Sequence, residues 1–140
     1  MAEAFTTTRR VDFADTDMAG IVHFTNFFRY MESAEVEFLR SRGLSVKMPW
    51  EGEAISFPRV AASCDFENPA RFEDVLEIAV RLERLGRKSV TYAFTFTRDG
   101  EPIAEGRVTS VCCRMMSDNQ IEPIRIPARL RAILKKSCLA

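Results

Sequence analysis

The chain has 140 residues, the usual length of one domain, and we expect a single domain over residues 1–140. Its 20 basic and 20 acidic residues cancel, so no overall charge would attract nucleic acid or an anionic membrane. A single histidine and four cysteines without a Cys-x-x-Cys pair disfavour a zinc site, and we expect no metal and no cofactor.

The first part of the chain predicts a strand, a loop and one long helix. Residues Ala4–Phe13 alternate and are rich in Thr, Val and Phe, which is typical of a strand. Residues Asp15–Gly20 favour a turn. From Asn26 to Arg42, apolar residues recur in steps of four, three and four, which places them on one face of a helix. Thr25 or the asparagine after it would cap the start, and Gly43 would end the helix.

The rest of the chain predicts four strands and a short helix. Turn signals such as Asp99-Gly100 separate segments of alternating or β-branched residues. These segments are Ile55–Glu67, Val75–Leu85, Ser89–Arg98 and Glu101–Met115. Pro127 would open the terminal helix. With the four strands in meander order, the sum is an α+β fold: one long helix packed on a five-stranded antiparallel sheet, with a short C-terminal helix.

The sequence also supports expectations about oligomerisation, membrane association and cellular compartment. Exposed edge strands favour pairing between subunits, so we expect a homo-oligomer. No apolar run approaches the roughly 18 residues of a membrane span, so we expect no membrane partner. The chain shows no signal peptide, and its cysteines favour reduced thiols in the cytoplasm. Cys112 and Cys113 would be a core and a surface position of one strand.

The segment from Asp15 to Gly20 is unusual because two carboxylates stand two residues apart shortly before the long helix. The first turn of a helix offers free N–H groups and the positive end of the helix dipole. These groups could stabilise the charge on a carbonyl oxygen while a nearby carboxylate attacks the carbonyl carbon or activates water. The same pattern also serves turn formation and capping alone, so the residues by themselves leave both interpretations open.

Residues 13–27 closely resemble the active-site signature of the 4-hydroxybenzoyl-CoA thioesterase family. The signature reads Phe13-Ala-Asp15-Thr-Asp17-Met-Ala-Gly20-Ile-Val-His23-Phe-Thr-Asn26-Phe27. The resemblance continues along the helix and returns at residues 68–78, 86–89 and 123–127, so it spans almost the whole chain in the family's order. It implies the hotdog fold, in which an antiparallel sheet wraps a long helix, and it implies acyl-CoA thioesterase activity.

By this resemblance Asp17 matches the catalytic aspartate, which in the family acts as a nucleophile or as a general base toward water. Gly20 matches a glycine that lets the loop turn tightly. Backbone N–H groups around Phe24 and Thr25 match those that polarise the thioester carbonyl. Asn26 would cap the helix or touch the substrate.

Two more residues are expected to bind the substrate. His23 stands where many relatives carry Tyr or Trp, and both a catalytic role and a place in the pocket wall stay open. Glu32 matches a position where some members acting on aromatic acyl groups place a carboxylate facing a phenolic hydroxyl. The alternative for Glu32 is a pairing with Arg29 or another cation.

Arg87, Lys88 and Ser89 resemble the place where the family holds the phosphates of coenzyme A. Basic side chains at a turn can reach phosphate oxygens, and arginine can do so in bidentate fashion. Arg125 is a further candidate for the same contact. Glu122 departs from the family, since a position near it is often basic.

We therefore predict an enzyme that hydrolyses an acyl-CoA with an aromatic or a short to medium acyl group, and the resemblance implies a dimer of dimers. One carboxylate and backbone donors would suffice, because a thioester carbonyl has little resonance stabilisation. Two alternatives remain. A non-catalytic acyl-CoA-binding module would not need the Asp17 carboxylate, and a hotdog dehydratase or hydratase would have to use His23 with Asp17.

Overall fold

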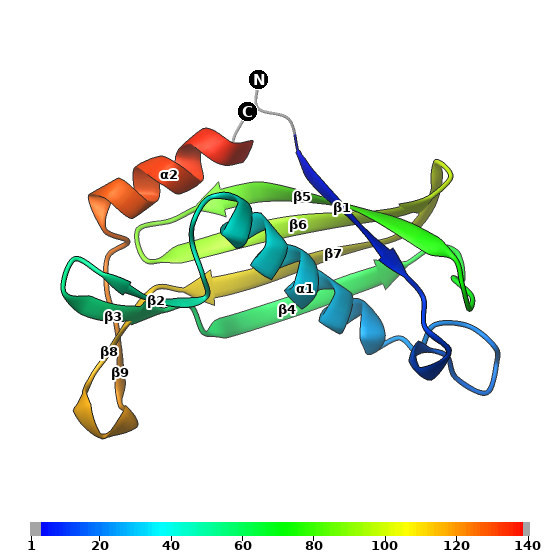
Figure 1. Ribbon diagram of the computed structural model, residues 1–140, viewed down its shortest axis with the longest axis horizontal. Helices are drawn as coiled ribbons and strands as arrows, with labels where there is room; N and C mark the ends of the chain where they lie inside the picture. Colours follow the sequence, from blue (N-terminus) through cyan, green and yellow to red (C-terminus); the bar gives the residue numbers. More distant parts are fainter. Residues whose placement is uncertain (1–3, 139–140) are drawn as a thin grey trace.

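The computed structural model describes residues 4–138, with residues 137 and 138 described by their backbone alone. Its central element is the helix α1 (Asn26–Ser41), which lies across one face of a five-stranded antiparallel sheet (Figure 1). The strands are β1 (Phe5–Arg10), β4 (Arg59–Phe66), β5 (Val75–Leu85), β6 (Ser89–Arg98) and β7 (Glu101–Val111). A shorter helix, α2 (Ala128–Cys138), packs beside β5. This arrangement confirms the α+β hotdog architecture expected from the sequence.

The strand order in this sheet is β1-β5-β6-β7-β4. The strands β5, β6 and β7 follow one another as hairpins, and the second hairpin turns at Asp99 and Gly100. Both turn residues have positive φ, +48° and +82°, as tight hairpin turns favour. The expected meander is wrong for β4, which pairs with β7 at one edge of the sheet. The first strand, β1, pairs with β5 and forms the other edge.

The structure contains a second, smaller sheet that the sequence did not predict. It contains β2 (Lys47–Trp50), β3 (Glu53–Ser56), β8 (Cys113–Met115) and β9 (Ile121–Pro123). Each of two predicted long strands is therefore divided between the two sheets. Pro58, which has no N–H for a sheet ladder, separates β3 from β4. Cys112 separates β7 from β8, because its N–H donates to the Lys88 carbonyl at 2.7 Å. Cys113, expected at the surface, is buried.

The helix α1 and the sheet bury a common apolar core. The predicted helix face is confirmed, since Phe27, Met31, Ala34 and Phe38 are each no more than 4% exposed. The backbone of β7 approaches this face closely at Gly106. A Cβ atom there would lie 2.4 Å from the Met31 sulfur and 2.9 Å from the Ser63 carbonyl oxygen, so only glycine allows this separation of helix and sheet.

The two ends of α1 differ from each other. At its end Gly43 has φ +73°, its N–H donates to Arg40, and the Leu44 N–H donates to Leu39. This is a Schellman motif, so the predicted terminator is confirmed. At its start Thr25 occupies the N-cap position as predicted, but its backbone is helical and its side chain makes no capping bond.

Short elements complete the chain. The first strand ends at Arg10, earlier than predicted, and the 3₁₀ turn η1 (Phe13–Asp15) follows it. A second 3₁₀ turn, η2 (Ser117–Asn119), joins β8 to β9. Pro127 immediately precedes α2 as predicted, and its carbonyl accepts the Arg131 N–H. None of the helices described is long and apolar enough to span a membrane.

Candidate active site

Asp17 lies in a tight loop between η1 and α1. The loop closes through two hydrogen bonds of 2.9 Å, from Asp17 N–H to the Ile21 carbonyl and from Gly20 N–H to the Asp17 carbonyl. Gly20 has φ +80°, a conformation that glycine adopts readily. The Asp17 Oδ1 accepts the Ala19 N–H at 2.9 Å, and Oδ2 has no hydrogen-bond partner among the described residues. The half-buried carboxylate is therefore held at one oxygen and free at the other.

Asp15 connects this loop to α1 and β1. Its backbone carbonyl accepts the His23 N–H and the Asn26 side-chain amide, each at 2.9 Å. Its carboxylate accepts the hydroxyl of buried Tyr30 at 2.8 Å, with Arg9 at 4.0 Å. Burial and the neighbouring Asp15 carboxylate raise the pKa of Tyr30, so its hydroxyl stays protonated and donates. Sequence reasoning missed Tyr30 and Arg9, and it did not foresee that the Asn26 amide holds the loop through the Asp15 carbonyl.

The N–H groups at the start of α1 are unequally used. The Thr25 N–H donates to the His23 Nδ1 at 3.3 Å, and the same nitrogen lies 2.7 Å from the Thr25 hydroxyl. The Phe24 N–H has no hydrogen-bond acceptor within the part of the chain that the structure describes. Of the two predicted carbonyl-binding amides, that of Phe24 is therefore the free one. The His23 ring stacks on the Phe24 ring, with centroids 4.9 Å apart.

A cleft of about 410 Å³ opens beside Asp17. Its other lining residues are Ile21, Val22, Phe24, Phe27, Phe66, Glu67, Asn68, Pro69 and Ala70. The cleft thus brings the carboxylate together with three aromatic side chains, from the loop before α1, its first turn and the end of β4. Of the predicted residues, Asp17 and Phe24 line it. Gly20, His23 and Thr25 belong to the same loop, and Asn26 is the first residue of α1, but none of the four lines the cleft.

Residues 67–70 line the cleft, and the segment 68–74 is fastened to the Asp17 loop and to β6. The Val22 N–H donates to the Ala70 carbonyl at 2.8 Å. From the end of β6, Arg98 donates to the Pro69 carbonyl at 3.1 Å and to the Asp74 carboxylate at 2.6 Å. Partial burial alone would raise the pKa of Asp74, but the hydrogen bonds from Arg98 and from the Arg71 N–H outweigh it, so the pKa is lowered. Arg98 is another residue that sequence reasoning missed.

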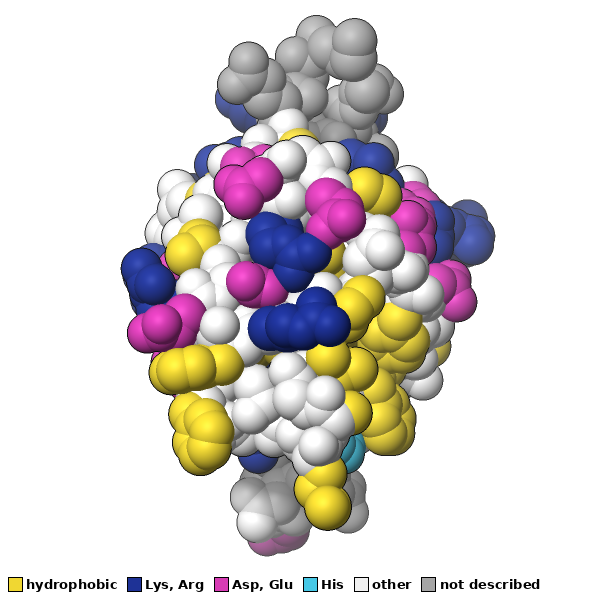
Figure 2. All heavy atoms as spheres, turned by 90° about the vertical axis from the view of Figure 1, so that its right-hand side faces the viewer, with side chains coloured by type: hydrophobic (Ala, Val, Ile, Leu, Met, Phe, Trp, Pro, Cys, Tyr) yellow, Lys and Arg dark blue, Asp and Glu magenta, His cyan; other side chains and the backbone are white. Residues whose placement is uncertain are grey.

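Apolar side chains are exposed around this end of the molecule. Phe13, Met18, Phe24, Phe66 and Phe72 are between 49% and 106% exposed relative to a free residue. Figure 2 views the molecule from this end and shows hydrophobic side chains gathered in its lower half. An exposed apolar patch of this kind marks a binding groove or an interface between proteins.

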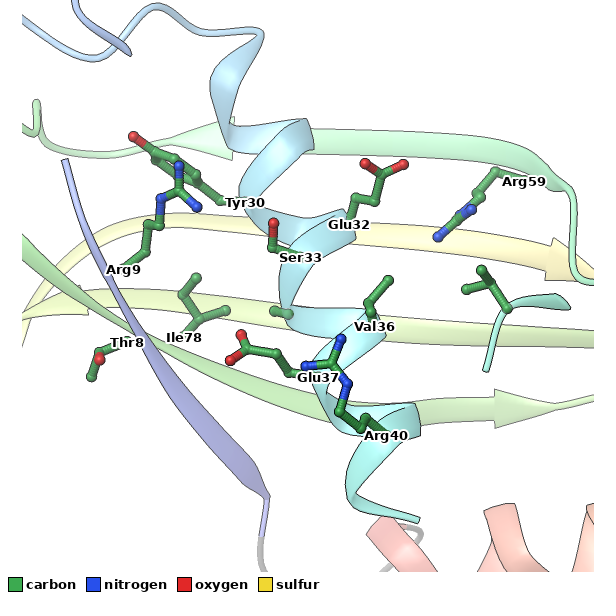
Figure 3. Close-up of a pocket in the computed structure, with 12 residues that line it drawn as sticks. Thr8, Arg9, Tyr30, Glu32, Ser33, Val36, Glu37, Arg40, Arg59 and Ile78 are labelled. Atoms are coloured by element: carbon green, nitrogen blue, oxygen red, sulfur yellow. The ribbon is translucent and has the colours of Figure 1, made fainter. Parts of the chain in front are cut away.

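Glu32 lies outside the Asp17 cleft. It is exposed in a groove of about 470 Å³ along the outer side of α1, on the same side as Arg59, while Arg9 and Tyr30 lie at the other end (Figure 3). Arg59 pairs with the buried Glu35 at 3.1 Å. Burial raises the pKa of Glu35 despite this cation. Among the described residues Glu32 itself has no ion-pair partner, so the alternative pairing with Arg29 or another cation does not form within one chain.

Two of the predicted phosphate-binding residues share a second cavity, of about 530 Å³. Its lining residues are Arg87, Arg125, Ile126, Pro127, Ala128 and Arg131. Lys88 and Ser89 belong to the same turn but do not line this cavity. The turn between β5 and β6 lies at the opposite end of the sheet from the Asp17 loop (Figure 1). Residues 4–138 contain no cluster of three or more side chains suited to a metal ion.

Known proteins resemble the chain along almost its whole length. The family model described as "Thioesterase-like superfamily" matches residues 11–134. A protein of Aquifex aeolicus is 37% identical over 128 residues, covering 91% of this chain and 94% of that one. The 4-hydroxybenzoyl-CoA thioesterase of a Pseudomonas strain is 28% identical, covering 91% and 95%. The structure of a gentisyl-coenzyme A thioesterase, 29% identical, superposes with a TM-score of 0.77 and covers 93% and 99%.

Proposed function

The chain belongs to the thioesterase-like superfamily, and from that premise we propose that it hydrolyses the thioester bond of an acyl-CoA, releasing the free acid and coenzyme A. One observation carries the proposal. The free Oδ2 of Asp17 and the free N–H of Phe24 belong to one short loop, and both residues line the same apolar cleft. A thioester carbonyl placed there would meet a carboxylate and a hydrogen-bond donor together.

The proposed chemistry needs one carboxylate. The Phe24 N–H binds the thioester oxygen and stabilises its developing negative charge, aided by the positive end of α1. As a nucleophile, Asp17 attacks the carbonyl carbon, coenzyme A leaves as a thiolate, and water hydrolyses the resulting mixed anhydride. As a general base, Asp17 instead takes a proton from the water that attacks. Label in the Asp17 side chain after a single turnover in ¹⁸O-labelled water would establish the nucleophilic route, because water that attacks the Asp17 carbonyl of the anhydride leaves its oxygen there.

We propose an aromatic or a short to medium acyl group as the substrate. Support comes from the aromatic lining of the cleft by Phe24, Phe27 and Phe66. The names of the 4-hydroxybenzoyl-CoA and gentisyl-coenzyme A thioesterases indicate that these relatives act on aromatic thioesters. Gly20, His23, Thr25, Asn26 and Glu32 stay proposed substrate-binding or loop-shaping positions.

For the coenzyme A phosphates we propose Arg87, Lys88, Ser89 and Arg125. Support comes from the shared cavity of Arg87 and Arg125, neither of which forms an ion pair among the described residues. Because β5 has 11 residues, it separates this cavity from the Asp17 end by roughly 35 Å, at about 3.3 Å per residue. We therefore propose that the arginines of one copy serve the cleft of another, in a homo-oligomer arranged as a dimer of dimers. The cysteine content favours a cytoplasmic setting.

Release of free thiol from a panel of acyl-CoAs tests the function. We expect turnover by the native protein and a loss of at least about 10³-fold in Asp17→Asn, since such a step depends on the carboxylate. Undiminished thiol release by Asp17→Asn would overturn the assignment. Binding of acyl-CoA without turnover would indicate the binding module, and a change in enoyl absorbance without thiol release would indicate a hydratase.

A further inference from the structure

The turn that carries Arg87 and Lys88 is fixed from outside through its carbonyl groups. Within the turn, the Gly86 N–H donates to the Ser89 carbonyl at 2.8 Å. The Arg87 carbonyl accepts the Ile126 N–H at 2.9 Å, and the Lys88 carbonyl accepts the Cys112 N–H at 2.7 Å. These bonds hold the turn against the segment before α2 and against the junction of β7 with β8.

The remaining two carbonyls of residues 85–88 bind one side chain of α2. Arg131 donates from Nη1 to the Gly86 carbonyl at 2.8 Å and from Nη2 to the Leu85 carbonyl at 3.2 Å. The arginine is half-buried, so water competes weakly for these bonds. The planar, forked guanidinium suits such a double contact, which a lysine could not make in the same geometry.

Arg131 also faces the cavity that Arg87 and Arg125 line. Three guanidinium groups thus surround about 530 Å³ of open space. Their mutual repulsion would spread the arginines apart unless the backbone held them. Arg131 donates to the carbonyls of Leu85 and Gly86, the two residues immediately before Arg87. These hydrogen bonds therefore fix the position of the Arg87 backbone, from which its side chain extends.

On this geometry we propose that Arg131 is a positioning residue for the phosphates of the thioester substrate. It fastens the Leu85–Lys88 turn to α2, so that Arg87 and Arg125 converge on one phosphate-binding cavity. The inference rests on the proposed function, since it takes a coenzyme A ester as the ligand. It concerns binding of the nucleotide part of the substrate and leaves the chemistry at Asp17 unchanged.

The test compares two substrates with the same acyl group, one carried by coenzyme A and one by pantetheine, which has no phosphate. In Arg131→Met we expect KM for the acyl-CoA to rise about tenfold at unchanged kcat, the loss typical of a charged hydrogen-bonded contact. Hydrolysis of the acyl-pantetheine should keep its native kcat/KM. An equal loss with both substrates, or no change with acyl-CoA, would overturn the proposal.

Two further variants sharpen the comparison. Arg131→Lys keeps the charge but cannot bridge both carbonyls in the same way. We therefore expect it to lose most of the preference for the acyl-CoA over the acyl-pantetheine, through a raised KM for the acyl-CoA. A native KM in Arg131→Lys would contradict a positioning role. Arg129→Met removes a cation from the same helix outside the cavity, where Arg129 is 79% exposed, and should leave both KM values unchanged.

Binding of coenzyme A itself, measured by calorimetry, separates this inference from the proposed function. If the native protein hydrolyses neither thioester, the proposed function fails. The same tenfold weakening in Arg131→Met would still be expected for coenzyme A, and its absence would overturn the positioning role.

Discussion

The hydroxyl of Tyr30 joins α1 to the Asp15 carboxylate at 2.8 Å, two residues before Asp17. In Tyr30→Phe this bond is lost while the buried ring stays. We expect kcat to fall about tenfold, because a hydrogen bond to a charged group contributes roughly 1.5–3 kcal/mol and the loop would lose its fixed position. Thiol release measures the change. Thr7→Val is a matched control, since it removes a hydroxyl bond of 3.0 Å to Glu37 away from the cleft. Equal rates in both variants would contradict a specific role for Tyr30.

Glu35 gives the stability of the protein a distinct pH dependence. Burial raises its folded-state pKa above the ordinary value of 4.5, although Arg59 acts in the opposite direction. Its contribution to stability is therefore fully present below the unfolded pKa and is lost as the pH rises through the folded value. Relative to Glu35→Gln, the native protein should lose unfolding free energy as the pH rises from 4.5. Denaturant titrations of both proteins across this range measure the difference, and parallel curves would contradict the assignment.

The residues of the candidate site were predictable to different degrees. Asp17 and Phe24 belong to one short segment with a family resemblance, and the structure places both at one cleft. Tyr30, Arg98 and Arg131 were not predictable, because each acts on a partner 15 to 46 positions away in the chain. Contacts over such separations depend on strand pairing and helix packing, which local patterns do not report.

At the scale of the elements, the contact between α1 and β7 at Gly106 leaves no room for a side chain. Gly106→Ala would force a methyl group against the Met31 sulfur and the Ser63 carbonyl. We expect a loss of about 1–3 kcal/mol in the free energy of unfolding, the usual cost of overpacking a core. Gly86→Ala is a matched control, because its Cβ would meet the movable Ser89 hydroxyl instead. Urea titration of both variants measures the difference, and a native midpoint for Gly106→Ala would contradict the packing argument.

Local alternation and tertiary pairing explain which elements were predictable. The bounds of β5 and β6 are confirmed, since strict alternation and turn residues define both strands. The place of β4 beside β7 was not predictable, because the order of strands depends on which edge accepts the chain after it crosses the sheet. The second sheet was missed because its strands have only three or four residues, too few to show a period.

At the scale of the whole molecule, the two edges of the main sheet differ in character. The edge strand β4 exposes Val60 at 63% and Phe66 at 49%, whereas β1 exposes Thr6 and other polar side chains. We expect copies to pair along β4. If the protein forms the proposed homo-oligomer, Val60→Lys should convert it to smaller species, because a charge on an edge strand opposes pairing. Light scattering after gel filtration measures the mass, with Thr6→Lys on β1 as the control. An unchanged mass for Val60→Lys would exclude this edge.

The separation of the Asp17 cleft from the arginine cavity by the length of the sheet has a genetic consequence (Figure 1). If each active site combines the Asp17 cleft of one copy with the arginine cavity of another, two inactive variants can complement each other. An Asp17→Asn chain still supplies arginines, and an Arg87→Ala chain still supplies the carboxylate. Co-expressed, the pair should recover a fraction of native turnover that neither shows alone, and strict additivity of the two residual rates would show that each chain works by itself.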